Sequence, residues 1–244
     1  MANKKKLETT VGTASTSPTF YKVTLTVTED MLGTAPSNPD IYSEYIASKA
    51  LRDEKKLAKT DEEKAVVAAK QEAVTKEELA MLPEDSAKGV TVFRRNATGL
   101  ILTDTMIRGF LKEGAGAIGC GGSSWGLTSK IDRYIFITDE NRRPVRQIPL
   151  IRDGKQVSVP DGTYERPLRA MTMQGPRVTL AASEIVKAPF TLSFYVTVVG
   201  LGTSDKGKIT HDVLTSWFEY GVYTGLGQHR NGGHGRFDAV VEAI

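Results

Sequence analysis

The residues best suited to chemistry lie together near the C-terminus, where positions 225–236 read GLGQHRNGGHGR. Backbone N–H groups in a glycine-rich loop can bind phosphate oxygens, and flanking guanidinium groups strengthen such contacts. Histidines can hydrogen-bond to nucleic acid, stack on a base or move protons. A tight turn between a helix and a strand is the plainer interpretation of the same loop. Its candidate binding residues are Gly227, His229, Arg230, Gly232, Gly233, His234, Gly235 and Arg236.

The glycine loop matches none of the common nucleotide-binding motifs. It does not complete the pattern GxGxxG, it follows a predicted helix where a dinucleotide fingerprint follows a strand, and the chain has no GK[ST] sequence. A metal site at His229 and His234 would need a third ligand, and no second histidine or cysteine pair offers one. We therefore expect neither a cofactor nor a metal.

A second glycine-rich stretch, GAIGCGGSSWG at 116–126, contains Cys120, Ser123 and Ser124. A nucleophile needs an adjacent base, and the spacing resembles no cysteine or serine hydrolase signature. We assign no catalytic residue here. We expect a surface loop whose Trp125 packs on the body of the protein or on a base.

Two further groups of cations accompany the glycine loop. Arg108 and Lys112 lie one turn apart on the polar face of a helix predicted from about 104 to a stop at Gly114. Arg142, Arg143 and Arg146 lie on a hairpin predicted from strands at 132–137 and 145–151. These five residues complete the set of candidate nucleic-acid contacts.

The elements around these residues mix helices and strands without a regular alternation. Strict period-two patterns predict strands at 21–28, 190–198 and 236–244. An amphipathic helix is predicted between the last two, with Thr210 as its N-cap and Gly221 at its C-terminal end. An α+β fold is favoured over a doubly wound one.

Composition limits the remaining possibilities. With 244 residues, 40% apolar content and a net charge of +3, we expect a globular protein whose affinity for nucleic acid, if any, depends on local patches. The single cysteine and the polar N-terminus favour a cytoplasmic location, in a bacterium or a phage-infected host, without membrane association. Residues 1–18 are predicted to be a disordered arm and 19–244 a single domain. That domain carries a helical insertion at about 41–88, and the alternative interpretation of this insertion is a partner-binding arm.

The order of these motifs resembles the RAMP superfamily, the repeat-associated RNA-binding proteins of CRISPR systems, and most of all its backbone subunit that polymerises along guide RNA. The resemblance covers about 90–244 and the first strand. It rests on Arg108 in the mid-chain helix, Glu184 with Phe190, and the final GHGR, although LTDT replaces the usual proline-glycine turn. The stretch VTEDMLGTAPSNPDIYSEYIASKA is similar to uncharacterised bacteriophage proteins. The family resemblance implies a ferredoxin-like, RRM-related core with large helical and hairpin insertions.

Residues and resemblance together favour sequence-tolerant binding of single-stranded nucleic acid, RNA before DNA, by a subunit of a ribonucleoprotein or filament. Two alternatives stay open. The first is a phage structural or assembly protein in which the glycine loop is a subunit contact. The second is a metal-independent endoribonuclease that uses a loop histidine. Self-association, head to tail along a bound strand, is implied by the resemblance.

Overall fold

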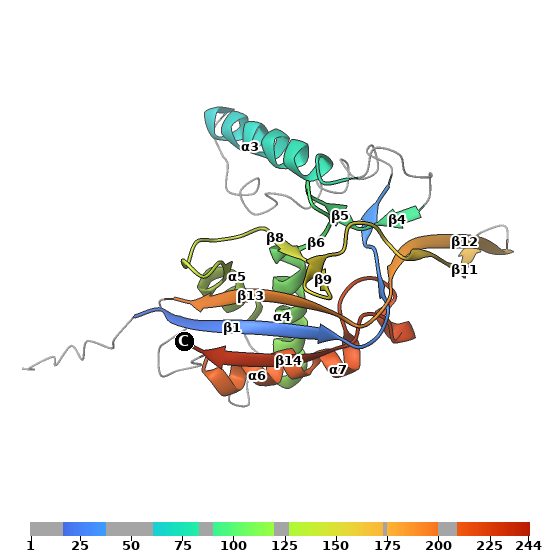
Figure 1. Cartoon of the computed structure of the whole chain (residues 1–244). Coiled ribbons are helices and arrows are strands. Elements are labelled where there is room, and N and C mark those ends of the chain that lie inside the picture. The colour runs from blue at the N-terminus through green and yellow to red at the C-terminus, as the bar shows by residue number, and fades with distance from the viewer. Residues whose placement is uncertain (1–16, 38–60, 83–89, 120–126, 173–174, 200–208) are drawn as a thin grey trace, which may run out of the picture.

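A computed structural model describes residues 17–37, 61–82, 90–119, 127–172, 175–199 and 209–244. At its centre is an antiparallel sheet that carries helices on one face (Figure 1). The central strands, in spatial order, are β14 (Phe237–Ala243), β1 (Thr19–Val27), β13 (Phe190–Val198) and β7 (Ile135–Thr138). The helices are α4 (Asp104–Ile118), α5 (Leu127–Tyr134), α6 (His211–Glu219) and α7 (Gly221–Thr224).

Strand order and connections define a ferredoxin-like core. β1 leads through α4 and α5 to β7, and β13 leads through α6 and α7 to β14. β1 pairs antiparallel with both β13 and β14, and β13 pairs antiparallel with β7. This is the split βαβ arrangement of a βαββαβ unit. The predicted α+β class is confirmed, and the first and last strands lie in one sheet as expected.

The core forms where the alternating strands meet the helices. On β1, alternate residues from Tyr21 to Val27 are buried, and Leu25 lies opposite Leu192 of β13 and Ala239 of β14. The helices bury Phe110, Trp217 and Phe218, among others, against that face. Each large apolar side chain removed from water contributes roughly 1.5–3 kcal/mol, so this layer fixes which face of the sheet is covered.

The first insertion, between β1 and α4, lies over one edge of the core (Figure 1). α3 (Asp61–Leu79) stands apart from the sheet as a mostly solvated helix inside the predicted insertion 41–88. Residues 38–60 and 83–89 of that region, and 1–16 of the predicted arm, lie outside the described residues. The elements of this insertion are β2 (Met31–Leu32), β3 (Ala35–Pro36), α3 (Asp61–Leu79), β4 (Val90–Val92), β5 (Arg94–Arg95) and β6 (Leu100–Thr103).

The second insertion, between β7 and β13, ends in a long hairpin that projects from the core (Figure 1). Its two strands pair antiparallel along their whole length, and the second also pairs with β2 and β4. The elements are β8 (Gln147–Pro149), β9 (Ile151–Arg152), β10 (Lys155–Gln156), β11 (Gly162–Thr172) and β12 (Gly175–Val186). Large hairpin insertions were expected, and this is one.

The hairpin predicted from 132–137 and 145–151 is wrong in two respects. Residues up to Tyr134 belong to α5, which buries Ile131 completely in the core. After β7 the chain turns back and forms one antiparallel bridge, between Thr138 and Pro144, but β8 pairs with β6 and not with β7. The predicted strand at 132–137 is therefore divided between the end of α5 and the start of β7.

Both glycines predicted to end helices have another role. α4 continues past Gly114, where a Cβ would lie 2.9 Å from the carbonyl oxygen of Trp217 on α6. Gly221 begins α7, and a Cβ there would overlap the ring of Phe237. These glycines allow close packing between elements. Thr210, by contrast, is the N-cap of α6 as predicted, because its hydroxyl accepts a hydrogen bond from Val213 N at 3.3 Å.

Candidate nucleic-acid interface

The glycine loop is a tightly hydrogen-bonded corner between α7 and β14. Leu226 N donates to Gly235 O at 2.8 Å, and Gly235 N donates to Asp30 O at 2.9 Å. Gln228 N reaches Leu32 O at 3.3 Å. Gly235 has a φ of 72°, and a Cβ there would overlap the carbonyl oxygen of Leu226. The loop therefore fastens the start of β14 to the chain that follows β1.

These contacts use many of the N–H groups that a phosphate cradle would need. The amides of Gly225, Leu226, Gln228, Gly232, Gly233 and Gly235 all donate to backbone carbonyls within the protein. An amide that already donates inside the fold gains little by turning to a phosphate. Any phosphate contact by this loop must therefore depend mainly on its cationic side chains.

The two loop arginines differ in their freedom. Arg230 forms an ion pair with Glu113 of α4, with Nη1 and Oε2 2.5 Å apart. The Arg236 side chain is exposed, and its guanidinium carbon lies 3.7 Å from where a Cβ on Gly233 would be. The carbonyl of Arg236 accepts a hydrogen bond from Thr28 N at 2.9 Å. Arg236 is thus anchored through its backbone and leaves its charge at the surface.

The two loop histidines gather around a tyrosine of the long hairpin. The rings of His229 and His234 lie 5.4 Å apart, and the ring of Tyr164 on β11 lies 4.8 Å from that of His234. His234 Nδ1 is 3.2 Å from Asp30 O. His229 precedes the short 3₁₀ helix η2 (Arg230–Gly232) with a left-handed φ of 57°. We call Tyr164, His229 and His234 the histidine cluster.

Burial and nearby charge lower the pKa of one member of the histidine cluster. Desolvation, followed by the nearby charges of Arg166 and His234, lowers the pKa of His229 below its usual value. A neutral imidazole at neutral pH can accept a proton or a hydrogen bond. It does not supply positive charge to a phosphate.

Arg108 and Lys112 lie on α4, the helix that packs against the covered face of the sheet. Arg108 forms an ion pair with Asp104 one turn earlier, with Nη2 and Oδ2 2.7 Å apart. Lys112 forms one with Asp132 of α5, with Nζ and Oδ1 2.6 Å apart. Each predicted cation is thus held beside a carboxylate, which offsets its attraction for phosphate.

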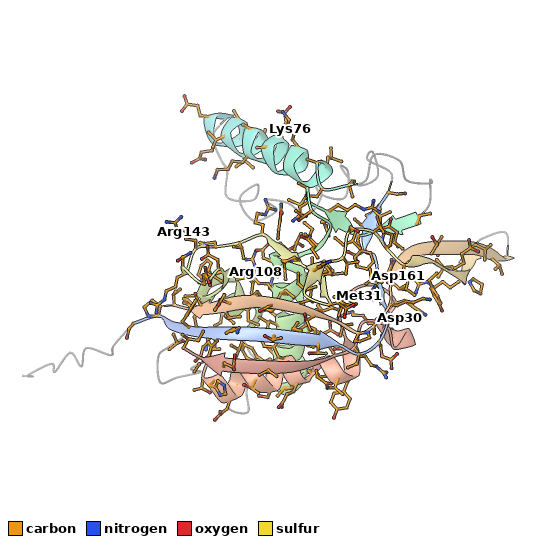
Figure 2. All side chains as sticks on the ribbon, in the orientation of Figure 1. Asp30, Met31, Lys76, Arg108, Arg143 and Asp161 are labelled. Atoms are coloured by element: carbon orange, nitrogen blue, oxygen red, sulfur yellow. The ribbon has the colours of Figure 1, made fainter. Side chains whose placement is uncertain are left out.

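The arginines at 142–146 lie at a different place, on the turn that follows β7. The Arg142 guanidinium lies over the ring of Phe20, 5.0 Å from its centroid, in a cation–π contact. Arg143 is exposed, and Figure 2 shows it at the opposite end of the sheet from Asp30 and the glycine loop. Arg146 is half-buried, and its carbonyl accepts a hydrogen bond from Asp104 N at 3.1 Å.

Aromatic side chains meet these arginines on the face of the sheet that carries none of the described helices. Phe20 of β1 and Tyr195 of β13 stack with their ring centroids 5.1 Å apart and their planes 3° from parallel. Phe136 of β7 is 37% exposed and lies opposite Thr197, which in turn lies opposite Phe20. We call this surface the open face. Its other residues on β1, β13 and β14 are Lys22, Thr24, Thr26, Thr191, Ser193, Asp238, Val240 and Glu242.

Sequence reasoning missed these aromatic residues, although a signal was present. Alternation places Tyr21 and Val23 in the core, so Phe20 and Lys22 must share the other face. The same rule puts Tyr195 among the polar positions of β13. A large aromatic side chain at a position where the pattern predicts a polar one is the signal.

Glu184, which the family resemblance singled out, has a structural role in this protein. Its carboxylate accepts a hydrogen bond from Phe93 N at 2.8 Å and pairs with Arg95 at 2.5 Å. These contacts join β12 to the chain between β4 and β5. Phe190, its companion in the resemblance, is a buried core residue.

Three expectations, on the second glycine-rich stretch, on metal binding and on membrane association, can be compared with the structure only within the described residues. The stretch from Cys120 to Gly126 lies outside the described residues. Among those that are described, no group of three or more histidine, cysteine, aspartate or glutamate residues could hold a metal ion. Over the same ranges, none of the helices combines the length and apolarity needed to cross a membrane.

Comparison with known proteins gives little further guidance. Neither a protein family model nor a curated protein sequence matches this chain. One similar solved structure is titled "Cryo-EM structure of the Type III-B Cmr-beta bound to cognate target RNA". The two chains are 12% identical, and the TM-score is 0.39. The match covers 93% of this chain but 61% of the other, so this chain spans less than two thirds of the length of that protein. A likeness at this level says nothing about what this chain binds.

Proposed function

We propose that this chain binds single-stranded nucleic acid, RNA before DNA, on the open face of its ferredoxin-like sheet, as a self-associating subunit of a ribonucleoprotein or filament. One observation carries the proposal: the stack of Arg142, Phe20 and Tyr195, with exposed Phe136 two strands from Phe20. The ring of Tyr195 is partly exposed and that of Phe136 is 37% exposed, so these two rings give unpaired bases a place to stack, whereas Phe20, only 6% exposed, packs against Tyr195. Neighbouring guanidinium groups attract the phosphates that connect them.

Stacking of this kind tolerates many sequences. Every base has a π-face, and stacking on a protein aromatic side chain contributes about 1–3 kcal/mol per base. A duplex buries those faces inside its own stack, so this surface selects single strands. The polar residues Thr24, Thr26 and Ser193 can hydrogen-bond to sugars, including the 2′-hydroxyl that distinguishes RNA.

Charge indicates the path of a bound strand across the open face. β14 contributes Asp238 and Glu242 to this face, and Glu242 lies directly opposite Lys22. A phosphate chain over β14 would meet like charge. Arg142 and Arg143 belong to the turn that follows β7, at the other edge of the sheet, and Arg142 reaches over Phe20 of β1, so we propose that the strand follows the side of β7 and β13.

The glycine loop would meet such a strand at the far end of the sheet. Phe20, beneath Arg142, is separated by eight residues of extended chain from Thr28, which contacts Arg236. At ~3.3 Å per residue this is about 26 Å. A stacked strand rises by about 3.4 Å per nucleotide, so the two ends are about eight nucleotides apart. Arg236 could hold a phosphate there, whereas Arg230 would first have to leave Glu113.

A gel-shift titration tests the proposal. Labelled single-stranded RNA, single-stranded DNA and duplex are compared, with the double variant Tyr195→Leu, Phe136→Leu. We expect both single strands to shift, RNA at the lower protein concentration, and the variant to bind about tenfold or more weakly. Tyr223→Leu on α7 is the matched control, because this tyrosine is 72% exposed away from the open face. Preference for duplex, or equal losses in both variants, would contradict the proposal.

A second candidate function, a metal-independent endoribonuclease, is favoured by the histidine cluster. His229 with its lowered pKa can act as a base toward a 2′-hydroxyl, and His234 or Tyr164 lies close enough to act as the acid. The same gels, run with EDTA, give the test. Cleavage that persists with EDTA and disappears in His229→Gln would support the enzyme, and a shift without cleavage would support binding alone.

A further inference from the structure

A hollow borders the open face where β7 and β13 meet the turn that follows β7. The hollow has a volume of about 300 Å³. Tyr195 and Ser193 of the open face line it from β13, and Asp139, Glu140 and Asn141 line it from the turn. It is therefore continuous with the aromatic stack on which the proposed function rests.

The turn that borders the hollow is held in one conformation by its own hydrogen bonds. Asp139 Oδ1 accepts from Asn141 N at 2.9 Å and from Arg143 N at 2.8 Å. Asp139 N donates to Arg143 O at 2.9 Å. These bonds occupy Asp139 Oδ1, so we expect the turn to meet a ligand mainly through the Glu140 carboxylate and the Asn141 side-chain amide. Gln147 adds a second amide, whose Oε1 accepts from Asn96 Nδ2 at 3.5 Å.

The chemistry of this lining suits a base and not a phosphate. Carboxylates repel phosphate, but they accept hydrogen bonds from amino groups. The side-chain amides of Asn141 and Gln147 can donate to ring nitrogens and carbonyls. Tyr195 provides an aromatic wall, and Arg142 and Arg143, on the same turn, are placed for the flanking phosphates. A turn backbone already held by hydrogen bonds also reduces the entropy lost on binding.

We propose that this hollow receives one unstacked base of the bound strand and prefers a base with an exocyclic amino group, cytosine above uracil. The inference rests on the proposed function. Cytosine presents an amino donor at position 4 and an acceptor at position 3, to face the Glu140 carboxylate and a side-chain amide. Uracil reverses both groups, so its carbonyl oxygen would face the carboxylate. Binding is thus tolerant of sequence except at this position.

Fluorescence titrations with oligo(C) and oligo(U) of about eight nucleotides, at pH 7.5, test the inference, because these probes differ only in the base edge. We expect oligo(C) to bind about tenfold more tightly. Glu140→Gln keeps the size of the side chain and removes the charge, so it should tighten oligo(U) and reduce the ratio several-fold. Glu62→Gln on α3 changes the net charge equally and should leave the ratio unchanged.

The outcomes separate the two proposals. Equal affinity for both oligonucleotides, or a ratio that Glu140→Gln leaves unchanged, overturns the base site and leaves the proposed function standing. Absence of binding to either oligonucleotide overturns both. A reduced ratio in Glu140→Gln with unchanged melting temperature supports the base site, because a purely structural role for Glu140 would not alter the preference between two pyrimidines.

Discussion

Replacing the two exposed arginines of the turn should weaken binding of single strands and make it less sensitive to salt. The variant is Arg142→Gln with Arg143→Gln. Each cation that neutralises a phosphate of a single strand contributes about 0.7 to the slope of log K against log salt. If both arginines contact phosphates, the slope decreases by about 1.4. Between 50 and 200 mM salt, the advantage of the wild type over the variant should then shrink by about sevenfold.

Glutamine is preferred to alanine for this test because it keeps most of the side-chain stem of Arg142 and removes only the guanidinium. Like arginine it has a Cβ, so the strain of the left-handed φ of 62° at this position is unchanged. Loss of the cation–π contact with Phe20 should cost about 0.5–1 kcal/mol of stability. Thermal melts measure that effect separately. The control is Lys70→Gln with Lys76→Gln on α3, which removes the same number of positive charges away from the turn.

Fluorescence anisotropy with labelled single-stranded RNA at four or more salt concentrations gives the slopes. The α3 control should lower the slope by much less than the turn variant. If the turn variant keeps the wild-type slope and affinity while remaining folded, the arginines do not contact phosphate. The proposed path beside β7 and β13 would then be wrong.

Three further predictions concern stability and the histidines. Gly235→Ala should lower the free energy of unfolding by about 2 kcal/mol or more, because its φ is left-handed and Leu226 O leaves no room for a Cβ. A thermal melt measures this, and an unchanged melting temperature would contradict the close packing of the glycine loop. Deleting 52–78 should leave a folded, soluble protein by circular dichroism. NMR titration should place His229 below about 6.5 and His211, beside Val241 O and Asp212, above it.

These two shifts have opposite consequences for stability. The lowered pKa of His229 means that the unfolded chain binds the proton first, so this residue's contribution is present above about pH 6.5 and is lost as pH falls toward the folded-state pKa. The raised pKa of His211 gives stability that is complete below about pH 6.5 and is lost as pH rises through its folded-state pKa. His229→Gln should therefore flatten the acid side of a stability profile.

Local patterns predicted the core because its strands alternate without interruption. The period-two runs around Val23 and Leu192 place one face of each strand in the core, and Thr210 signals the start of α6. The pairing of β8 with β6 depends on contacts between distant segments, which no local pattern contains. Gly114 and Gly221 were wrongly predicted to end helices for the same reason, since the atoms that require a glycine at these positions belong to α6 and β14.

The candidate site was harder to predict than the fold. Arg108 stood out as a cation, but Asp104, one turn earlier, could have indicated its ion pair. The glycine loop drew attention by its composition, whereas its amides serve the fold. The stack of Phe20 on Tyr195 joins residues 175 positions apart in the printed sequence, so only the register between β1 and β13 reveals it.

The central claim is that nucleic acid lies across the open face, and ultraviolet crosslinking tests it most directly. Full-length protein would be crosslinked to a single-stranded RNA containing photoreactive uridine, digested, and the modified residues identified by mass spectrometry. We expect crosslinks at Phe136 of β7 and Tyr195 of β13. Crosslinks confined to α3, or to the helices on the covered face of the sheet, would contradict it.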